Sequence, residues 1–295
     1  MKVAVTGSHG LIGRAVVRAL AARGDEVVPL VRSEPRSGEV VWDPQAGTID
    51  AQGLEGVDAV VHLAGEGIGD RRWTPTHKAR VLDSRVRGTT LIAETIAGLS
   101  KKPDVLVSAS AIGFYGDRAD EILTEESAKG DDFLAHVVDQ WETSTSPAED
   151  AGIRVVKIRT GLVLSEEGGI LPKMMLPLRF FVGGRLGSGR QYMSWIAIDD
   201  QVGAILHLLG SDVSGPVDLT SPNPVTNAEF TKVLAEVMHR PAFLAVPAFA
   251  LKLALGSEMA KETVLVSQRA LPARLESSGY TFRHPELLGA LNSEC

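Results

Sequence analysis

The chain has 295 residues, of which 44% are hydrophobic and 23% charged, values typical of a globular protein with one large core and an appended lobe. Its formal net charge of −7 argues against broad nucleic-acid binding, which needs dense positive charge. There is no apolar run of bilayer-spanning length and no signal-peptide pattern, and the only cysteine is Cys295. We therefore expect a cytoplasmic protein without membrane insertion or disulfides.

Apolar runs alternate with helix-compatible segments over the first 165 residues. The expected strands are residues 3–6, 27–31, 59–63, 105–108 and 154–159, with a short edge strand at 40–42. The expected helices are residues 11–23, 76–97 and 132–151. Near-continuous apolar strands suit a parallel sheet buried on both faces. The sequence thus predicts an α/β fold with a Rossmann-type, doubly wound parallel sheet.

The rest of the chain is expected to be more irregular. Glycine-rich stretches at residues 168–169 and 183–190 predict loops on the substrate side, within residues 166–197. A helix is expected at residues 198–209 and a strand at 217–219. Residues 226–229 form a capping-box pattern, and Pro247 and Pro272 are placed to start short helices. We predict a dinucleotide-binding domain at residues 1–220 and a small, mostly helical domain at 221–295.

Three glycines separate the first predicted strand from the first predicted helix. Gly7 permits a sharp turn, Gly10 lets backbone N–H groups approach a pyrophosphate, and Gly13 lets the helix lie close to the sheet. This context predicts a dinucleotide site, the alternative being a tight turn without a ligand. The residues expected to contact the cofactor are Gly7, Ser8, Gly10, Leu11, Ile12 and Gly13.

The end of the second predicted strand bears on the choice of cofactor. Sites selective for NAD place an acidic residue there, whereas this strand ends at Arg32. An arginine can pair with the 2′-phosphate of NADP, so the sequence favours NADP(H). Against this, Glu34 follows closely, and Arg32 can also be an ordinary surface residue. Most of the basic side chains between residues 71 and 87 are likewise expected to be surface residues, on the solvent-exposed face of a helix.

Several motifs resemble the extended short-chain dehydrogenase/reductase superfamily, which includes the nucleotide-sugar epimerases. These motifs are residues 6–13, 62–65, 108–110 and 114–116. Further motifs resemble its atypical subfamily of "epimerase family" proteins or NADP-dependent oxidoreductases, namely residues 63–66, 72–73, 83–85, 141–142, 159–164, 187–191 and 195–200. The resemblance extends through the C-terminal part. It implies that the cofactor is contacted by Leu63, Ala64, Gly65, Glu66, Arg85 and Val163.

The superfamily's catalytic pair, a tyrosine followed four residues later by a lysine, is absent. The three tyrosines are Tyr115, Tyr192 and Tyr280, and none has a lysine at that spacing. Alignment of the helix places Glu142 at the lysine position. The candidate proton-transfer residues are then Ser110 and Tyr115. The alternative is a structural role for each, in which Ser110 only caps the end of a strand and Tyr115 only packs against a loop.

Two functions remain open. The first is an NADP-dependent oxidoreductase or epimerase-like enzyme that acts on a small polar substrate. The side chains expected to line the substrate pocket are Tyr192, Met193 and Trp195. The second is a catalytically silent NADP(H) sensor that acts through a protein partner. Histidine spacing gives no metal site, and neither the substrate nor the oligomeric state can be read from the sequence.

Overall fold

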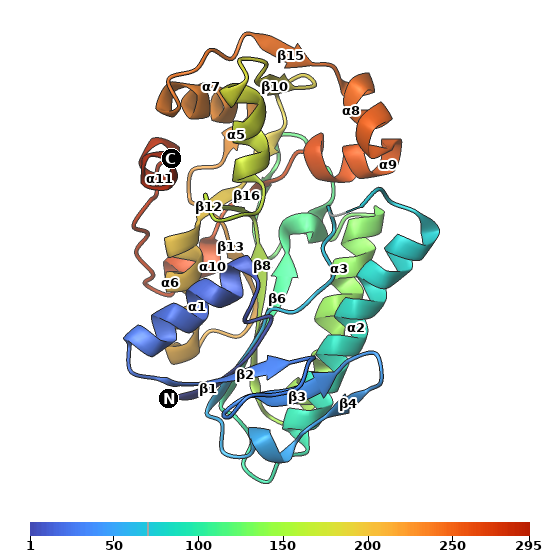
Figure 1. Ribbon diagram of the computed structural model, residues 1–295, viewed down its shortest axis with the longest axis vertical. Coiled ribbons are helices and arrows are strands. Elements are labelled where there is room, and N and C mark those ends of the chain that lie inside the picture. The colour runs from blue at the N-terminus through green and yellow to red at the C-terminus, as the bar shows by residue number, and fades with distance from the viewer. Residues whose placement is uncertain (70) are drawn as a thin grey trace. The chain divides into compact units, whose positions relative to one another are not determined.

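The computed structural model describes residues 1–69 and 71–295 and contains an eight-stranded sheet (Figure 1). The strand order is β13-β8-β6-β5-β1-β2-β3-β4. The strand bounds are β1 (Lys2–Thr6), β2 (Glu26–Val31), β3 (Val40–Asp43), β4 (Thr48–Ile49), β5 (Ala59–His62), β6 (Val105–Ala111), β8 (Arg154–Thr160) and β13 (Gly215–Leu219). Strand β1 pairs in parallel with β2 on one side and with β5 on the other. This order confirms the predicted doubly wound Rossmann-type sheet, whose topological switch lies at β1.

The buried strands explain why this sheet forms the core of its part of the molecule. Every residue of β5 is buried, and only the first residue of β1 is partly exposed. The connecting helices are α1 (Leu11–Ala22), α2 (Pro75–Ala97), α3 (Phe133–Thr143), α4 (Ser146–Asp150) and α6 (Ile198–Gly210), with a short 3-10 helix η1 (Gln52–Leu54). Trp42 of β3, Ile92 of α2 and Leu106 of β6 belong to one apolar cluster. Burial of such side chains stabilises the fold by about 1.5–3 kcal/mol each.

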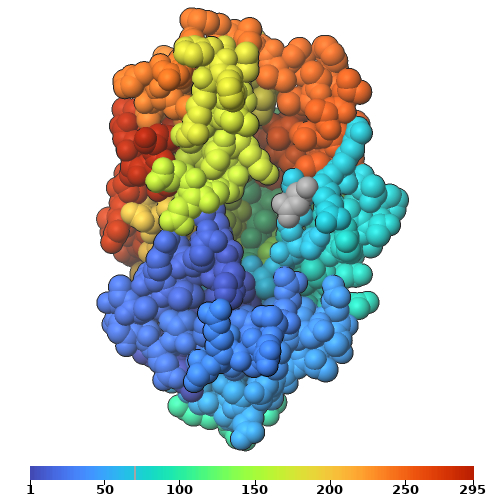
Figure 2. Space-filling view, in the orientation of Figure 1, coloured from blue at the N-terminus to red at the C-terminus, as the bar shows by residue number. Residues whose placement is uncertain are grey.

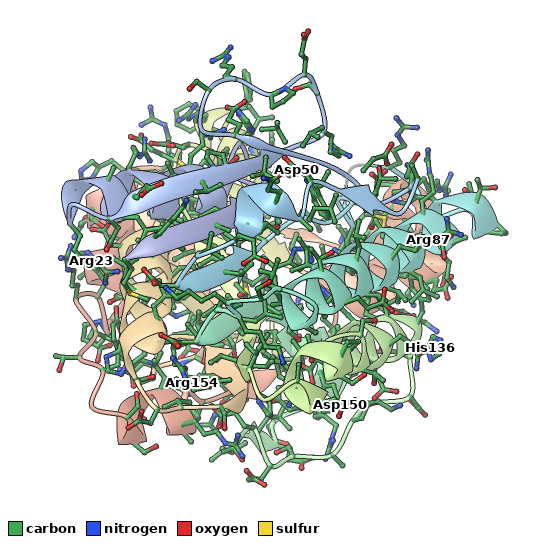
Figure 3. All side chains as sticks on the ribbon, turned by 90° about the horizontal axis from the view of Figure 1, so that it is seen from below. Arg23, Asp50, Arg87, His136, Asp150 and Arg154 are labelled. Carbon is green, nitrogen blue, oxygen red and sulfur yellow. The ribbon has the colours of Figure 1, made fainter. Side chains whose placement is uncertain are left out.

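The structure divides the helix expected at residues 132–151 into α3 and α4. The Thr145 hydroxyl donates to the carbonyl of Glu142, and the Ser144 hydroxyl donates to that of Gln140. These local bonds compete with the helical pattern, and Pro147 cannot donate a backbone hydrogen bond. Figure 3 shows α2, which carries Arg87, running alongside the helix pair that ends at Asp150.

Packing separates the chain into two compact units. Unit 1 comprises residues 1–110, 137–158 and 202–217, and unit 2 comprises residues 111–136, 159–201 and 218–295. The linear division predicted at residue 220 differs from this one because short strand pairs in unit 2 join early segments to late ones. These pairs are β7 (Ile122–Leu123) with β16 (Arg269–Ala270), β11 (Tyr192–Met193) with β14 (Val225–Thr226), and β10 (Gly184–Leu186) with β15 (Leu244–Val246). Part of the glycine-rich stretch is therefore a strand, not a loop as predicted.

Unit 2 has its own apolar core. Strand β9 (Leu162–Leu164) pairs with β12 (Trp195–Ala197), and Trp195 packs with Phe230 and Leu291. Its helices are α5 (Leu171–Arg179), α7 (Asn227–Val237), α8 (Ala248–Leu255), α9 (Ser257–Met259), α10 (Ala273–Ser277) and α11 (Leu287–Glu294), with the short helices η2 (Ile112–Tyr115) and η3 (Ala260–Val264). In Figure 2 the yellow-green surface around α5 adjoins the orange surface of the segment that includes α8.

Two local predictions for the C-terminal part are confirmed. Thr226 and Glu229 form a reciprocal capping box at the start of α7, and Pro247 and Pro272 immediately precede α8 and α10.

Within the described ranges, no helix is long and apolar enough to cross a bilayer. The same ranges contain no cluster of three His, Cys, Asp or Glu side chains able to hold a metal ion.

Candidate functional site

The turn between β1 and α1 is built around glycine. Gly7 has a φ of 67°, a left-handed conformation that favours a residue without Cβ. A Cβ there would also lie 2.9 Å from the carbonyl carbon of Leu63. The amide of Gly10 donates to the Gly7 carbonyl at 2.9 Å and closes the turn. The Gly7 backbone is therefore packed directly against the residues that follow β5.

The N-terminus of α1 is open to an anion. Gly10 is the N-cap residue, and no side chain in the described part of the chain caps this helix. The N–H groups of its first turn lack partners within the helix, and the helix dipole adds positive potential at this end. A Cβ on Gly13 would lie 2.1 Å from the Gly7 carbonyl oxygen, so glycine is required for the helix to approach the turn. This arrangement fits a bound phosphate group.

A chain of buried polar groups joins the ends of β1 and β5. The hydroxyl oxygen of Thr6 accepts hydrogen bonds from the amides of Leu63 and Ala64, at 3.0 and 3.2 Å. It also lies 2.8 Å from Nδ1 of His62. Because the hydroxyl oxygen already accepts two hydrogen bonds, we assign its one proton to the bond with Nδ1, so that Thr6 donates and Nδ1 accepts. This chain holds residues 62–64 beside the glycine turn.

His62 extends the same chain to α2 and α3. With Nδ1 accepting, its Nε2 donates to the Thr89 hydroxyl at 3.1 Å, and Trp141 donates to the same hydroxyl at 2.9 Å. His62 is fully buried, and burial lowers the pKa of its imidazole to about 4. The ring is therefore neutral at pH 7 and acts as a structural link. Thr89 and Trp141 were not predicted as site residues, because no short motif signals a contact between distant helices.

Arg85 differs from the other arginines and lysines between residues 71 and 87 in being buried, with 7% of its surface exposed. Its Nη1 donates to the carbonyls of Glu66 and Val81 at 2.9 and 3.0 Å, and its guanidinium lies 4.8 Å from the centre of the Trp141 ring. Burial lowers its pKa to about 10, so it remains charged at neutral pH. Its Nε is buried without a hydrogen-bond partner among the described residues.

The other predicted cofactor contacts lie around this region of unit 1, with one exception. A Cβ on Gly65 would lie 3.6 Å from the Arg85 guanidinium carbon, and the amide of Glu66 donates to the Ser84 hydroxyl. Arg32 is exposed directly after β2, two residues beyond the residue that pairs with Thr6. Val163 belongs to β9 of unit 2, where it pairs with Ile196. Its role beside a nicotinamide stays a prediction.

Ser110, at the end of β6, has a charged partner. Its hydroxyl donates to Oε1 of Glu142 on α3 at 2.6 Å, and both residues belong to unit 1. Ser110 is 4% exposed, whereas Glu142 is partly exposed. A hydroxyl that donates to a carboxylate keeps its oxygen lone pairs available to accept a further hydrogen bond. The pair can therefore receive a proton from a hydroxyl group placed next to Ser110.

Tyr115 has a different environment, inside unit 2. It is fully buried, and its hydroxyl donates to both carboxylate oxygens of Asp218 at 2.8 Å while accepting from Arg159. Burial and the Asp218 charge raise the pKa of this phenol above its ordinary value. The Arg159 guanidinium also lies 3.5 Å from the centre of the Phe114 ring. These contacts favour the packed-loop alternative for Tyr115 over proton transfer.

The expected substrate-side residues also differ in exposure. Trp195 is fully buried in the core of unit 2 and donates to the Asn223 carbonyl, so the expectation that it lines a pocket is wrong. Tyr192 and Met193 are partly exposed in β11. The glycine-rich motif predicted the neighbourhood but could not predict which side chains of the following strands face inward.

The chain is similar to known proteins in sequence and in fold. The model of the NAD dependent epimerase/dehydratase family matches residues 3–219, and a domain family of unknown function, DUF1731, matches residues 246–294. The epimerase family protein ML0860 of Mycobacterium leprae is 42% identical over 292 residues, which cover 98% of this chain and 94% of that protein. The crystal structure of human epimerase family protein SDR39U1 with NADPH is 35% identical, with a TM-score of 0.93, and covers 100% of this chain and 99% of that one.

A more distant structure shows the fold alone. MoeE5 in complex with UDP-glucuronic acid and NAD is 21% identical, with a TM-score of 0.80, covering 100% of this chain and 97% of that chain.

The glycine turn yields a stability prediction. Gly13→Ala places a methyl group where the Gly7 carbonyl oxygen lies, so the free energy of unfolding should fall by about 1–3 kcal/mol or more. Gly289→Ala in α11 is the matched control, because a Cβ there meets nothing within 4 Å and alanine favours helix by up to about 1 kcal/mol. Urea unfolding measures both. Equal stability of the two variants would contradict the close packing of Gly13.

His62 yields a prediction about pH. Because its folded-state pKa is lowered from 6.5 to about 4, the unfolded state binds the proton first as the pH falls. The stabilisation is therefore complete above about pH 6.5 and is lost between pH 6.5 and 4, by on the order of 3 kcal/mol. Urea unfolding at several pH values should show that the free energy of unfolding falls more steeply below pH 6.5 in the natural protein than in His62→Asn. The exposed His136→Asn variant should keep the steep fall. If His62→Asn lost stability as steeply as the natural protein, the lowered pKa of His62 would be refuted.

Proposed function

The chain belongs to the NAD dependent epimerase/dehydratase family, and on that premise we propose that it is an NADP-dependent oxidoreductase or epimerase-like enzyme acting on a small polar substrate. Unit 1 binds the cofactor, and Ser110 with Glu142 handles the proton. The observation that carries the proposal is the 2.6 Å hydrogen bond between these two side chains, at the end of a strand in the unit that holds the glycine turn.

The residues of unit 1 fit a dinucleotide. The uncapped N-terminus of α1 would hold the pyrophosphate, and Gly10, which has no side chain, leaves the backbone N–H groups of this helix end uncovered. Arg85 supplies a buried positive charge with an unpaired Nε beside residues 65–66. Neutral His62, through Thr6, holds the backbone of residues 63 and 64 in place.

The exposed Arg32 selects NADP(H) over NAD(H). It stands where NAD-selective sites place a carboxylate, and its guanidinium can form paired hydrogen bonds with the 2′-phosphate. The human relative that is 35% identical was crystallised with NADPH, which supports the same choice.

The protein supplies the proton chemistry. When bound, NADP(H) provides the hydride acceptor or donor. A substrate hydroxyl donates to Ser110, whose own proton already points to Glu142, so a proton leaving the substrate passes through the serine to the carboxylate. In the reverse direction a protonated Glu142 returns it. Tyr115 takes no part in this route and is a buried structural residue of unit 2, bonded to Asp218 and Arg159.

The alternative is a catalytically silent NADP(H) sensor that acts through a protein partner. The absence of the tyrosine and lysine pair and the burial of Ser110 favour it. The two proposals differ in whether any substrate turns over while the cofactor is bound.

Cofactor choice can be tested by titration calorimetry. The natural protein should bind NADPH at least tenfold more tightly than NADH, because the 2′-phosphate pairs with Arg32. Arg32→Ala should remove most of that difference while leaving the NADH affinity nearly unchanged. The exposed Arg190→Ala serves as the matched control and should behave as the natural protein. Equal affinities in the natural protein would eliminate the role of Arg32.

The proton route can be tested on whichever alcohol or carbonyl compound a screen shows to change the absorbance of the nicotinamide. Ser110→Ala and Glu142→Gln should each lower the rate about 10²–10⁴-fold with little change in NADPH affinity. The double variant should be hardly slower than either single one, because the two residues act in one route. Additive losses would contradict the shared route, and NADPH binding without turnover in a broad screen favours the sensor.

A further inference from the structure

A groove of about 340 Å³ opens on the surface of unit 2, between α7 and the segment that leads from this helix to β15. One face of α7 lines it together with residues of β10 and β15, and these elements lie side by side (Figure 1). Three of the lining residues are the alanines Ala228, Ala235 and Ala242, whose short side chains leave the groove hollow. The groove therefore has room for side chains of another molecule.

The lining of this groove is basic, although the chain as a whole has a net charge of −7. Arg185, Lys232 and Arg240 are exposed there, and the acidic residue among the lining residues is Glu236. Among the described residues, no carboxylate forms an ion pair with these three basic side chains, and the two arginines donate to backbone carbonyls instead. Their charges are therefore available to the carboxylates of a partner.

Large apolar side chains lie beside these charges. Phe243 and Leu244 of the groove lining are 90% and 51% exposed, and Phe180, directly after α5, is 70% exposed. The two segments meet, because the Arg240 guanidinium lies 5.1 Å from the centre of the Phe181 ring. An exposed group of aromatic and arginine side chains is typical of a protein interaction surface.

The backbone beside the groove holds Phe181 in a conformation that costs stability. Helices α5 and α7 end in the same hydrogen-bonded turn, with Phe181 (φ 61°) and His239 (φ 53°) in the left-handed position that glycine usually takes. Phe181 is 61% exposed, so burial of its ring offsets little of this cost. Contact of the ring with another molecule accounts for a phenylalanine at this position.

We propose that this groove binds an amphipathic segment of another protein, in which aspartate or glutamate residues flank large apolar side chains. The apolar side chains enter the groove above its alanines and contact Phe243, while the carboxylates pair with Arg185, Lys232 and Arg240. The inference goes beyond the cofactor chemistry, because every residue of the groove belongs to unit 2 and none takes part in the proton route.

Shape and charge favour this occupant over two others. A lipid bilayer presents a plane, which would touch Phe243 but would not fill a hollow lined by alanines. A second copy of the chain, related by twofold symmetry, would place the same basic side chains opposite one another, and like charges repel. An acidic amphipathic segment meets neither obstacle.

The test uses a phage-displayed library of random peptides, selected on the natural protein. The most enriched peptide is synthesised, and fluorescence anisotropy measures its affinity for the natural protein, Lys232→Glu, Arg240→Glu and Phe243→Ser. Lys261→Glu is the matched control, because Lys261 is an exposed basic residue of η3 and does not line the groove. Thermal unfolding and NADPH affinity are recorded for each variant, so that misfolding is separated from loss of the surface.

We expect the enriched peptides to combine acidic residues with large apolar ones. Lys232→Glu and Arg240→Glu should each weaken binding at least tenfold, because the reversed charge repels the carboxylates of the peptide. Phe243→Ser should weaken binding severalfold, and Lys261→Glu should bind within twofold of the natural protein. Absence of enriched peptides, or equal binding by Lys232→Glu and Phe243→Ser, overturns the proposal.

Two further measurements identify the other occupants. Co-sedimentation of the natural protein with phosphatidylglycerol vesicles, lost in Lys232→Glu and Phe243→Ser, would assign the groove to a bilayer. Dimerisation in sedimentation velocity, lost in the same variants, would assign it to a second copy. Either result overturns the proposal.

Phe181→Gly separates a binding role from a structural one. This variant should weaken the peptide severalfold without lowering the melting temperature, because glycine adopts the left-handed conformation without strain. A lower melting temperature with unchanged peptide affinity would show that the ring serves the fold alone, and would remove Phe181 from the surface.

Discussion

The hydroxyl of Thr6 is the contact on which the geometry of unit 1 depends. It accepts from two amides at the end of β5 and bonds the neutral ring of His62, so one side chain joins two neighbouring strand ends at the topological switch. The glycine turn packs against the same residues, with the Cβ position of Gly7 only 2.9 Å from the Leu63 backbone. Because the contact is buried, displacing one strand end would leave several polar groups unpaired.

The position of Arg85 follows from that junction. The segment fixed by Thr6 continues into Gly65 and Glu66, and the Glu66 carbonyl accepts from Arg85. Trp141 contacts both the guanidinium of Arg85 and, through its N–H, the Thr89 hydroxyl. The structural network and the charge proposed for the cofactor thus share one tryptophan. A substitution of Trp141 would disturb both together, and its effect could not be assigned to either alone.

Local signals in the sequence were sufficient to predict the strands and the glycine turn of unit 1, and insufficient to predict contacts between distant segments in either unit. The strands around β1 and the glycine turn were predicted because apolar runs and glycine spacing are local properties. The association of residues 111–136 and 159–201 with the C-terminal part was not, because it depends on short strand pairs between distant segments. The same holds for Tyr115 and Asp218, which are 103 residues apart in sequence, and for Ser110 and Glu142, which are 32 apart. Alignment with the superfamily placed Glu142 at the lysine position of its helix but did not indicate that it bonds Ser110.

The sign of the charge beside Ser110 limits the proton chemistry that we propose for this pair. In the superfamily that the sequence resembles, a lysine lowers the pKa of a tyrosine and makes that phenol an effective acid or base. Here a carboxylate stands at the lysine position and bonds the serine directly. A carboxylate cannot favour ionisation of a nearby phenol, but it can accept a proton through a hydroxyl. Loss of the tyrosine and the change from lysine to glutamate are therefore consistent with each other: a positive charge without a tyrosine has no acid to activate, whereas a negative charge with a serine supplies its own base.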